Sequence, residues 1–339
     1  MYVNFFPAHG LDSYTGYGRM ELGIARALQN SEVDVLLYPD LKYPMLMVNS
    51  SLQLLHAPHV NNTRLWAFNM IETNRVDPAW VEAINVRCER LFVPCPPMIE
   101  IYQQSGVEIP IDYVPLGVDL FADRLPTGDL HVTGEETPFV FLTYSYGEKR
   151  KGADIAVKAF ERAFGRDSRY KLVIKAREGY QMSWLQNLDN PQIELVTGRL
   201  SEEKWLALQR SAHCFVFSSR GEGWGMPPRE LTLAGVPTIA TQWLGMWDVD
   251  QWGIPLKYSH MSECEFVDYQ ANARDGLWSE PDIDDLVEKM QWVTTHYAEA
   301  RAKAKAGRAY LLENFSWQRV GERIIDLVQK HSLVAVPGA

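Results

Sequence analysis

The repeated alternation of short apolar runs with longer amphipathic segments constrains the fold of this chain more than any other feature. Runs of β-branched and aromatic residues predict strands, and segments with helical periodicity lie between them. This alternation is typical of parallel α/β layers, in which helices connect and cover the strands of a sheet. The sequence therefore predicts the α/β fold class.

The first third of the chain predicts one set of such elements. Strands are expected at 2-YVNFF-6, 33-VDVLLY-38, 52-LQLLH-56, 65-LWAFNM-70, 90-RLFVPC-95 and 112-DYVPL-116. Helices are expected near residues 17–29, 78–87 and 96–105. The residues between Gly117 and Pro138 are polar and rich in turn formers, which favours a domain linker there.

The rest of the chain predicts a second set. Strands are expected at 139-FVFLTY-144, 170-YKLVIK-175, 193-IELV-196, 213-HCFVFSS-219 and 236-VPTIA-240, with helices over 152–165, 201–210 and 228–234. After Pro281 the pattern is helical to about residue 331, with breaks near Thr295–His296 and Asn314–Phe315. The two sets predict two Rossmann-like, doubly wound domains, residues 1–122 and 138–314. The domains would face a central cleft, and ligands of such sheets bind at the carboxyl ends of the strands.

Composition excludes several classes of protein. With 339 residues and 46% apolar content, the chain can bury a large core. A formal net charge of −10 argues against nucleic acid as the main partner, because phosphate backbones require a basic surface. The start, MYVNFFPAHG, does not resemble a secretory signal, and no window reaches the length of a transmembrane segment. We expect a cytoplasmic protein whose four cysteines are reduced and structural.

The stretch 219-SRGEGWGMPPRELTLAGVPTIAT-241 is the strongest candidate site. A strand runs into a glycine-rich loop and then into a helix, so main-chain N–H groups and the positive end of the helix dipole can bind an anion. Glu222 lies on the loop, and Glu230 is expected in the first turn of the helix, where carboxylates can accept hydrogen bonds from hydroxyl groups. A nucleotide sugar would use all of these features. The alternative is an ordinary helix N-cap with solvated acids.

The segment from Glu222 to Glu230 resembles the E-x7-E motif of retaining glycosyltransferases with the GT-B fold, particularly glycosyltransferase family 4. The resemblance implies that Glu230 binds the ribose hydroxyls of the donor and that Glu222 contacts the donor sugar. It also implies that the intervening loop contacts sugar and phosphate through its backbone, at Gly223, Trp224, Gly225 and Met226.

Other segments extend this resemblance over nearly the whole chain. The stretches 147-GEKRKGADIAVKAFERAF-164 and 172-LVIK-175 resemble a strand-to-helix turn of the family and the strand that follows it. The segment 315-FSWQRVGERIIDLV-328 is similar to the C-terminal helix of the family, which implies a helix at about 315–339 that crosses back onto the first domain. The likeness is looser at 14-YTGYGR-19, 69-NMIETNRVDPAWV-81 and 113-YVPLGVD-119.

Three basic residues are expected at the carboxyl ends of two adjacent strands of the second domain. Arg150, Lys151 and Lys175 could converge on one diphosphate, where fixed cations would stabilise the charge that grows on a leaving phosphate. The alternative is a solvated charge run. Many family members carry an arginine about six residues before the lysine of the basic pair, where this chain has Ser145, so that Lys175 becomes the stronger candidate.

The first domain offers weaker candidates. Gly16 and Gly18 open a predicted helix whose amides would face the cleft, although an ordinary turn has the same pattern. The family resemblance implies that this glycine loop lies near the donor phosphate and the acceptor. His56 could bind the substrate or move a proton, or be structural. Glu72 could orient the acceptor hydroxyl, or cap a helix.

Two further patterns carry less weight. Asp248 and Asp250 match the D-x-D metal motif of another glycosyltransferase fold, but we interpret the match as coincidence and expect no metal and no cofactor. Of the tryptophans that crowd residues 224–252, only Trp224 is kept as a candidate for stacking on a sugar.

The resemblance implies a retaining, metal-independent enzyme that moves a hexose from a UDP- or GDP-sugar to a carbohydrate or other hydroxyl acceptor. It also implies a front-face displacement in which the leaving phosphate accepts the acceptor's proton, so no covalent nucleophile is assigned. One alternative is a nucleotide-sugar-binding pseudoenzyme that acts as a partner subunit. A weaker one is a GT-B phosphorylase or epimerase. Lipid, glycan, protein and nucleobase acceptors all stay open.

Overall fold

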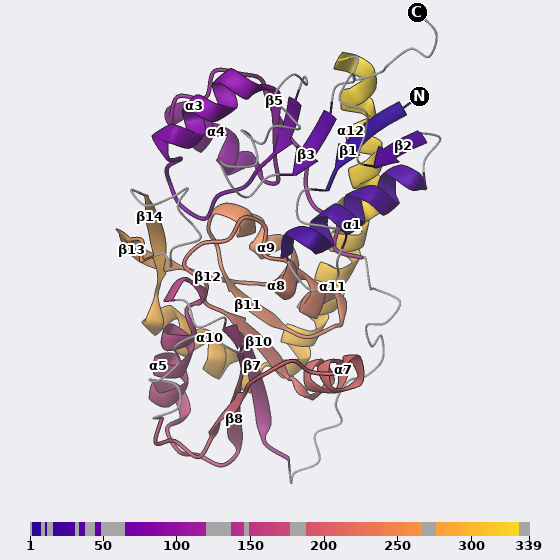
Figure 1. The fold of residues 1–339 in the computed structure, drawn as a ribbon. Helices are drawn as coiled ribbons and strands as arrows, with labels where there is room; N and C mark the ends of the chain where they lie inside the picture. The colour runs from indigo at the N-terminus through magenta and orange to yellow at the C-terminus, as the bar shows by residue number, and fades with distance from the viewer. Residues whose placement is uncertain are drawn as a thin grey trace, which may run out of the picture. The chain divides into compact units, whose positions relative to one another are not determined.

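Two compact units make up the chain in the computed structural model, which is drawn in Figure 1. The structure describes residues 2–7, 11, 16–30, 34–37, 45–48, 65–119, 137–145, 149–176, 188–265 and 276–331. Unit 1 consists of Met1–Leu120, Asp268–Gly276 and Glu313–Ala339, and unit 2 of Phe121–Val267 and Leu277–Leu312. The predicted boundaries at residues 122, 138 and 314 stay predictions.

The described part of unit 1 contains a six-stranded parallel sheet in the order β2-β1-β3-β4-β5-β6. Its strands are β1 (Tyr2–Phe6), β2 (Asp34–Leu37), β3 (Met45–Val48), β4 (Leu65–Phe68), β5 (Cys88–Val93) and β6 (Ile111–Tyr113). Its helices are α1 (Gly16–Gln29), α3 (Pro78–Arg87), α4 (Pro96–Gln104) and α12 (Trp317–His331). The strand order reverses between β1 and β3, as in doubly wound folds.

Helix starts in unit 1 follow from local chemistry. The carboxylate of Asp77 accepts a hydrogen bond from the backbone N–H of Ala79, and Pro78 occupies the first helical position of α3, where its missing N–H costs nothing. Pro96 opens α4 in the same way. The predicted helices at 78–87 and 96–105 are confirmed.

The C-terminal helix α12 packs along α1 within unit 1 (Figure 1). The indole of Trp317 fills the space beside two glycines. A Cβ atom built on Gly23 would lie 2.2 Å from the Trp317 ring, and one on Gly117 would lie 2.4 Å from it. The backbone N–H of Trp317 donates to the carboxylate of Asp119 at 2.8 Å, which fixes the start of the helix. The two glycines are therefore needed for close packing.

The described part of unit 2 contains a second six-stranded parallel sheet, in the order β12-β11-β10-β7-β8-β9. Its strands are β7 (Phe139–Ser145), β8 (Tyr170–Ala176), β9 (Ile193–Val196), β10 (Cys214–Phe217), β11 (Thr238–Thr241) and β12 (Ile254–Leu256). A separate antiparallel ribbon pairs β13 (Tyr258–Glu263) with β14 (Leu277–Pro281). The order is that of the Rossmann fold and reverses between β7 and β10.

Helices of unit 2 alternate with these strands. They are α5 (Ala153–Phe164), α7 (Glu202–Ser211), α8 (Met226–Leu233), α9 (Val249–Trp252), α10 (Ile283–Thr295) and α11 (Tyr297–Asn314), with the 3-10 turns η2 (Lys149–Lys151) and η3 (Leu244–Met246). The predicted breaks between the last three helices are confirmed.

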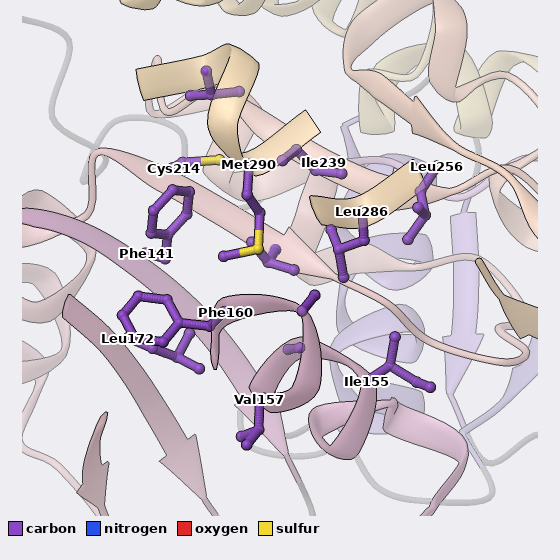
Figure 2. Packing of buried hydrophobic residues seen from close by; sticks show 14 of the residues in the cluster. Phe141, Ile155, Val157, Phe160, Leu172, Cys214, Ile239, Leu256, Leu286 and Met290 are labelled. Atoms are coloured by element: carbon purple, nitrogen blue, oxygen red, sulfur yellow. The ribbon is translucent and has the colours of Figure 1, made fainter. Parts of the chain in front are cut away.

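The core of unit 2 lies between the sheet and two helices that pack on each other, α5 and α10. Figure 2 shows Phe141 and Leu172 from neighbouring strands beside Phe160 of α5 and Met290 of α10. These side chains are fully buried. Burial of each contributes about 1.5–3 kcal/mol, so this core holds β7 and β10 in register and fixes the loops that follow them.

Some elements differ from the sequence-based expectation. The sequence did not predict β3 or the β13–β14 ribbon, and the expected strand 52-LQLLH-56 lies outside the described residues, as does most of the expected linker after Gly117. The four cysteines all lie among the described residues and form no disulfide, and burial raises the pKa of the Cys88 thiol to about 12. No helix among the described residues is both long and apolar enough to span a membrane.

Candidate functional site

The candidate site lies where the sheet order of unit 2 reverses, between the carboxyl ends of β7 and β10. The turn η2 approaches from β7, and residues 218–225 follow β10. A backbone hydrogen bond joins the two segments: the N–H of Arg220 donates to the carbonyl of Arg150 at 2.7 Å. The fold thus places the basic turn against the acidic loop.

Gly152 permits this approach. Its φ of +67° is a conformation that side chains disfavour, and a Cβ atom there would lie 1.7 Å from the carbonyl oxygen of Ser218. The hydroxyl of Ser218 in turn donates to the carbonyl of Gly152 at 2.8 Å. A glycine directly after the basic pair is therefore a geometric requirement of the turn.

Glu222 binds both basic residues of the turn. Its Oε1 accepts hydrogen bonds from Lys151 Nζ at 2.7 Å, from Ser219 Oγ at 2.7 Å and from Arg150 Nη1 at 3.3 Å. Arg150 Nη1 also donates to the carbonyl of Gly221 at 2.7 Å. We call Arg150, Lys151 and Glu222 the switch-point cluster.

The switch-point cluster is buried, with side chains 7% to 9% exposed. Burial raises the pKa of Glu222, but the charges of Lys151 and Arg150 and the hydrogen bonds from Lys151 and Ser219 outweigh it, so the pKa lies below its ordinary value. The carboxylate is ionised, and two cations share it. The three charged groups together carry one positive charge, which favours an anionic ligand.

The second carboxylate oxygen of Glu222, Oε2, accepts none of these three hydrogen bonds. Within the described part of the chain, all three hydrogen bonds to its carboxylate go to Oε1. The two oxygens of an ionised carboxylate offer about four acceptor sites between them. Oε2 can therefore accept from a hydroxyl group while Oε1 stays bound to Lys151.

The helix α8 follows the loop directly. Gly225 is its N-cap with a φ of +75°. Because Pro227 and Pro228 have no N–H, the backbone donors that this helix start can offer an anion are those of Gly225 and Met226. The expected helix start near residue 228 was wrong, because Pro227 and Pro228 fit inside the first turn and the helix begins at Met226. Glu230 consequently lies in the second turn, half-buried, instead of the first.

The side chain of Trp224 is buried. Its indole is 2% exposed and stacks on the guanidinium of Arg229, whose Cζ lies 3.9 Å from the ring centroid. Arg229 donates to the Trp224 carbonyl and to Oδ1 of Asp248 at 2.6 Å. The expectation that the Trp224 indole stacks on a sugar is therefore corrected, because the ring is covered by Arg229. Asp248 of the D-x-D pattern belongs to a buried ion pair with Arg229. Only the Trp224 backbone stays a candidate.

Lys175 lies at the end of β8, next to β7 in the sheet. Its Nζ donates to the carbonyls of Ala176 at 2.6 Å and Gly198 at 2.7 Å. Ser145, at the position where an arginine was expected, is buried as the last residue of β7. Lys175 stays a candidate for contact with a ligand.

Candidates of the first domain lie in unit 1. Gly16 opens α1 as an exposed residue, and Gly18 is buried in its first turn. Glu72 follows β4 and is half-buried, and His56 lies outside the described residues. Burial and the neighbouring Tyr17 and Glu72 raise the pKa of Tyr102 well above its ordinary value, and the Tyr102 hydroxyl donates to Oδ1 of Asn69, which directly follows β4.

Several residues of the site were not predicted, because nothing in the sequence alone distinguishes them. Arg220 and Arg229 read as ordinary charged residues near the motif, and both are buried ligands of carboxylates. Gly245 packs against the Glu222 backbone, whose carbonyl accepts its N–H at 3.0 Å. These residues were missed because the groups that they bind lie far away in the sequence. No group of three metal-binding side chains occurs among the described residues.

A family model matches the segment that carries this site. Residues 131–249, which include the switch-point cluster and Glu230, match the family model Glycosyl transferases group 1. A protein of Sulfolobus islandicus rod-shaped virus 1, named Uncharacterized protein 356, is 22% identical over 286 residues, which cover 79% of this chain and 77% of that protein.

Solved structures share the fold over most of the chain. Alr3699/HepE from Anabaena, in complex with UDP and glucose, matches with a TM-score of 0.71, at 11% identity, over 97% of this chain and 100% of that one. Sucrose-phosphate synthase from Thermosynechococcus elongatus matches with a TM-score of 0.67, at 16% identity, over 97% and 98%. The chain spans about half of TarM, 54% of its length, with a TM-score of 0.60. The chain therefore has a GT-B fold.

Proposed function

We propose that this chain is a retaining, metal-independent glycosyltransferase of family 4 that transfers a hexose from a UDP- or GDP-sugar to a hydroxyl acceptor. The observation that carries the proposal is the switch-point cluster: two buried cations and one ionised glutamate beside a helix N-terminus. Alr3699/HepE binds UDP and glucose on the same fold, which supports this class of donor.

Different residues would bind different parts of the donor. Glu230 would hold the ribose hydroxyls, and Oε2 of Glu222 would accept from a hydroxyl of the sugar. The backbone from Gly223 to Met226, at the N-terminus of α8, would bind the diphosphate. Lys151, with Arg150 and Lys175, would stabilise the negative charge that grows on the phosphate as the glycosidic bond breaks.

Residues of unit 1 would serve the acceptor side. Glu72 or His56 would orient the acceptor hydroxyl, and the helix start at Gly16 and Gly18 would lie near the donor phosphate. In the reaction the acceptor oxygen bonds to the anomeric carbon, and the bond from that carbon to the phosphate oxygen breaks with its electron pair. The acceptor proton passes to the leaving phosphate, so both atoms and charge balance.

Titration calorimetry against a panel of UDP-, GDP- and ADP-sugars tests the donor assignment. We expect one nucleotide sugar to bind, and Glu230→Ala and Lys175→Ala to weaken that binding by roughly 10-fold or more, because each removes a charge-assisted contact. Glu194→Ala, on the exposed end of a surface ion pair, is the control and should bind like the wild type. Absence of binding across the panel would overturn the proposal.

Release of nucleoside diphosphate in the presence of glycan, lipid and protein acceptors tests the enzymatic activity. Lys151→Met should lower kcat by about 10²- to 10³-fold, because it removes a cation from the developing phosphate charge. Lys171→Met, at a surface ion pair, is the matched control and should leave kcat unchanged. Turnover should persist in EDTA, and NMR of the product should show retention at the anomeric carbon.

The alternative of a pseudoenzyme partner subunit is not proposed, because no comparison supports it and the acidic and basic residues of the motif are all present. Donor binding without turnover on any acceptor would favour it again. The expected cytoplasmic location, the absence of a cofactor and the absence of a nucleic-acid partner stay predictions.

A further inference from the structure

We propose that Arg220 is a positioning residue that holds the switch-point cluster in the geometry required for the donor diphosphate. The inference rests on the proposed function and assigns a role to a residue that does not itself belong to the cluster. Arg220 lies two residues before Glu222, and its side chain is 1% exposed.

The guanidinium of Arg220 uses all five of its N–H donors. Nη1 and Nη2 donate to the two carboxylate oxygens of Asp154 at 2.9 and 2.8 Å. Nε and Nη2 donate to the two oxygens of Glu280 at 2.7 Å each. Nη1 also donates to the carbonyl of Lys149. Two bidentate pairs and one carbonyl contact saturate the group.

These contacts tie together the elements that carry the cluster. Lys149 begins the turn η2, which presents Lys151, and Asp154 lies in the first turn of α5 directly behind it. Glu280 belongs to β14, outside the central sheet. A single side chain therefore joins the basic turn, its helix and the β13–β14 ribbon to the loop of Glu222.

The backbone of Arg220 repeats these connections. Its N–H donates to the carbonyl of Arg150 at 2.7 Å. Its own carbonyl accepts from the backbone N–H of Ser279 at 3.0 Å and from the Ser279 hydroxyl at 2.8 Å. Burial lowers the pKa of Arg220, but the hydrogen bonds and charges of Asp154 and Glu280 hold it above its ordinary value, so the cation persists at every physiological pH.

The planar guanidinium of an arginine is required at position 220. Lysine would keep the charge, but it offers three donors on a tetrahedral ammonium and cannot form two bidentate pairs at once. Replacement by lysine would therefore release part of the tether without removing the charge. A displacement of about 1 Å between Lys151 and the loop of Glu222 is enough to weaken binding of a transferring phosphate.

Binding and turnover of Arg220→Lys test the inference. Titration with the nucleoside diphosphate and with the plain nucleoside of the donor that binds the wild type separates phosphate contacts from base contacts. We expect the Kd of the diphosphate to rise, and kcat to fall, by roughly 10- to 100-fold, while the Kd of the nucleoside stays unchanged. A general loss of structure would weaken both ligands. Arg162→Lys is the matched control, because Arg162 lies on α5 with Asp154 and forms an exposed ion pair with Asp284 of α10; it should change neither.

A double variant shows whether Arg220 acts through Lys151. Arg220→Lys in a Lys151→Met background should cause far less additional loss than in the wild type, because the positioned group is already gone. If Arg220→Lys does not fold, Glu280→Gln provides the test. It weakens one bidentate pair at a partly exposed carboxylate, and it should weaken diphosphate binding by a smaller factor while nucleoside binding stays unchanged.

Two outcomes would overturn the inference. Equal loss of diphosphate and nucleoside binding would show a general structural role, and unchanged diphosphate binding in both Arg220→Lys and Glu280→Gln would show no role at all. In each case the wild type still binds its donor and the proposed function stands. A wild type that binds no nucleotide diphosphate contradicts the proposed function itself and removes the inference with it.

Discussion

Glu222 accepts hydrogen bonds from a lysine, an arginine and a serine on one oxygen, and these contacts keep it ionised in a buried setting. The same contacts make the residue part of the stability of unit 2. Removing its charge would leave Lys151 and Arg150 buried without the carboxylate that compensates them. Breaking a buried ion pair in this way is strongly destabilising.

Glu222→Gln should lower the free energy of unfolding by about 3 kcal/mol at neutral pH. Because the pKa of Glu222 is lowered in the folded state, its ionisation stabilises the protein fully above the ordinary value of 4.5. That contribution declines as the pH falls below 4.5 and is lost once the pH passes the lowered pKa. Urea unfolding of wild type and variant at several pH values should show the difference shrinking in acid. A difference that does not depend on pH would contradict this assignment.

The motif was visible at the residue scale, but its pairing was not. The spacing of Glu222 and Glu230 around glycines predicted an anion site, and the glycine after Lys151 has a geometric cause in its contact with Ser218. The sequence could not predict that Lys151 binds Glu222, because 71 positions separate the two residues. A charged residue in a sequence does not indicate which opposite charge it will bind.

At the scale of elements, the packing of α12 depends on two glycines, Gly23 and Gly117, that leave space for the indole of Trp317. Trp317 packs against α1 only because Gly23 lacks a side chain. Gly23→Ala should therefore lower the free energy of unfolding by about 1–3 kcal/mol, although alanine normally stabilises a helix relative to glycine. Urea unfolding monitored by tryptophan fluorescence measures the change.

The smaller ring of Trp317→Phe should relieve this clash. The double variant should lose less stability than the sum of the two single variants, because the residues are in direct contact. Strict additivity, or a more stable Gly23→Ala variant, would show that the ring does not occupy the space beside Gly23.

Elements with strong local signals were predicted well. Prolines and a capping aspartate mark α3 and α4, and the helical run after Pro281 breaks at the expected positions. The start of α8 was misplaced by two residues because proline is compatible with the first turn of a helix as well as with the residues before it. The β13–β14 ribbon was not predicted, because polar residues such as Ser259 and His260 lack the alternation of a half-buried strand.

For the whole molecule, periodicity predicts that the strands are parallel but not their order. The reversal between β7 and β10 depends on pairing between strands far apart in the chain, which local patterns do not encode. The sequence predicted doubly wound domains without an order of strands, and the fold shared with Alr3699/HepE and sucrose-phosphate synthase agrees with that class. The position of the candidate site then follows from topology, because ligands of doubly wound sheets bind at the point of reversal.

A crystal structure of the protein with the nucleoside diphosphate that binds most tightly tests the central claim most directly. We predict that the β-phosphate lies in unit 2 at the reversal between β7 and β10, with an oxygen about 2.7–3.2 Å from Lys151 Nζ or from a backbone N–H between Gly223 and Met226. A diphosphate bound elsewhere, with the switch-point cluster left without contact to it, would contradict the account.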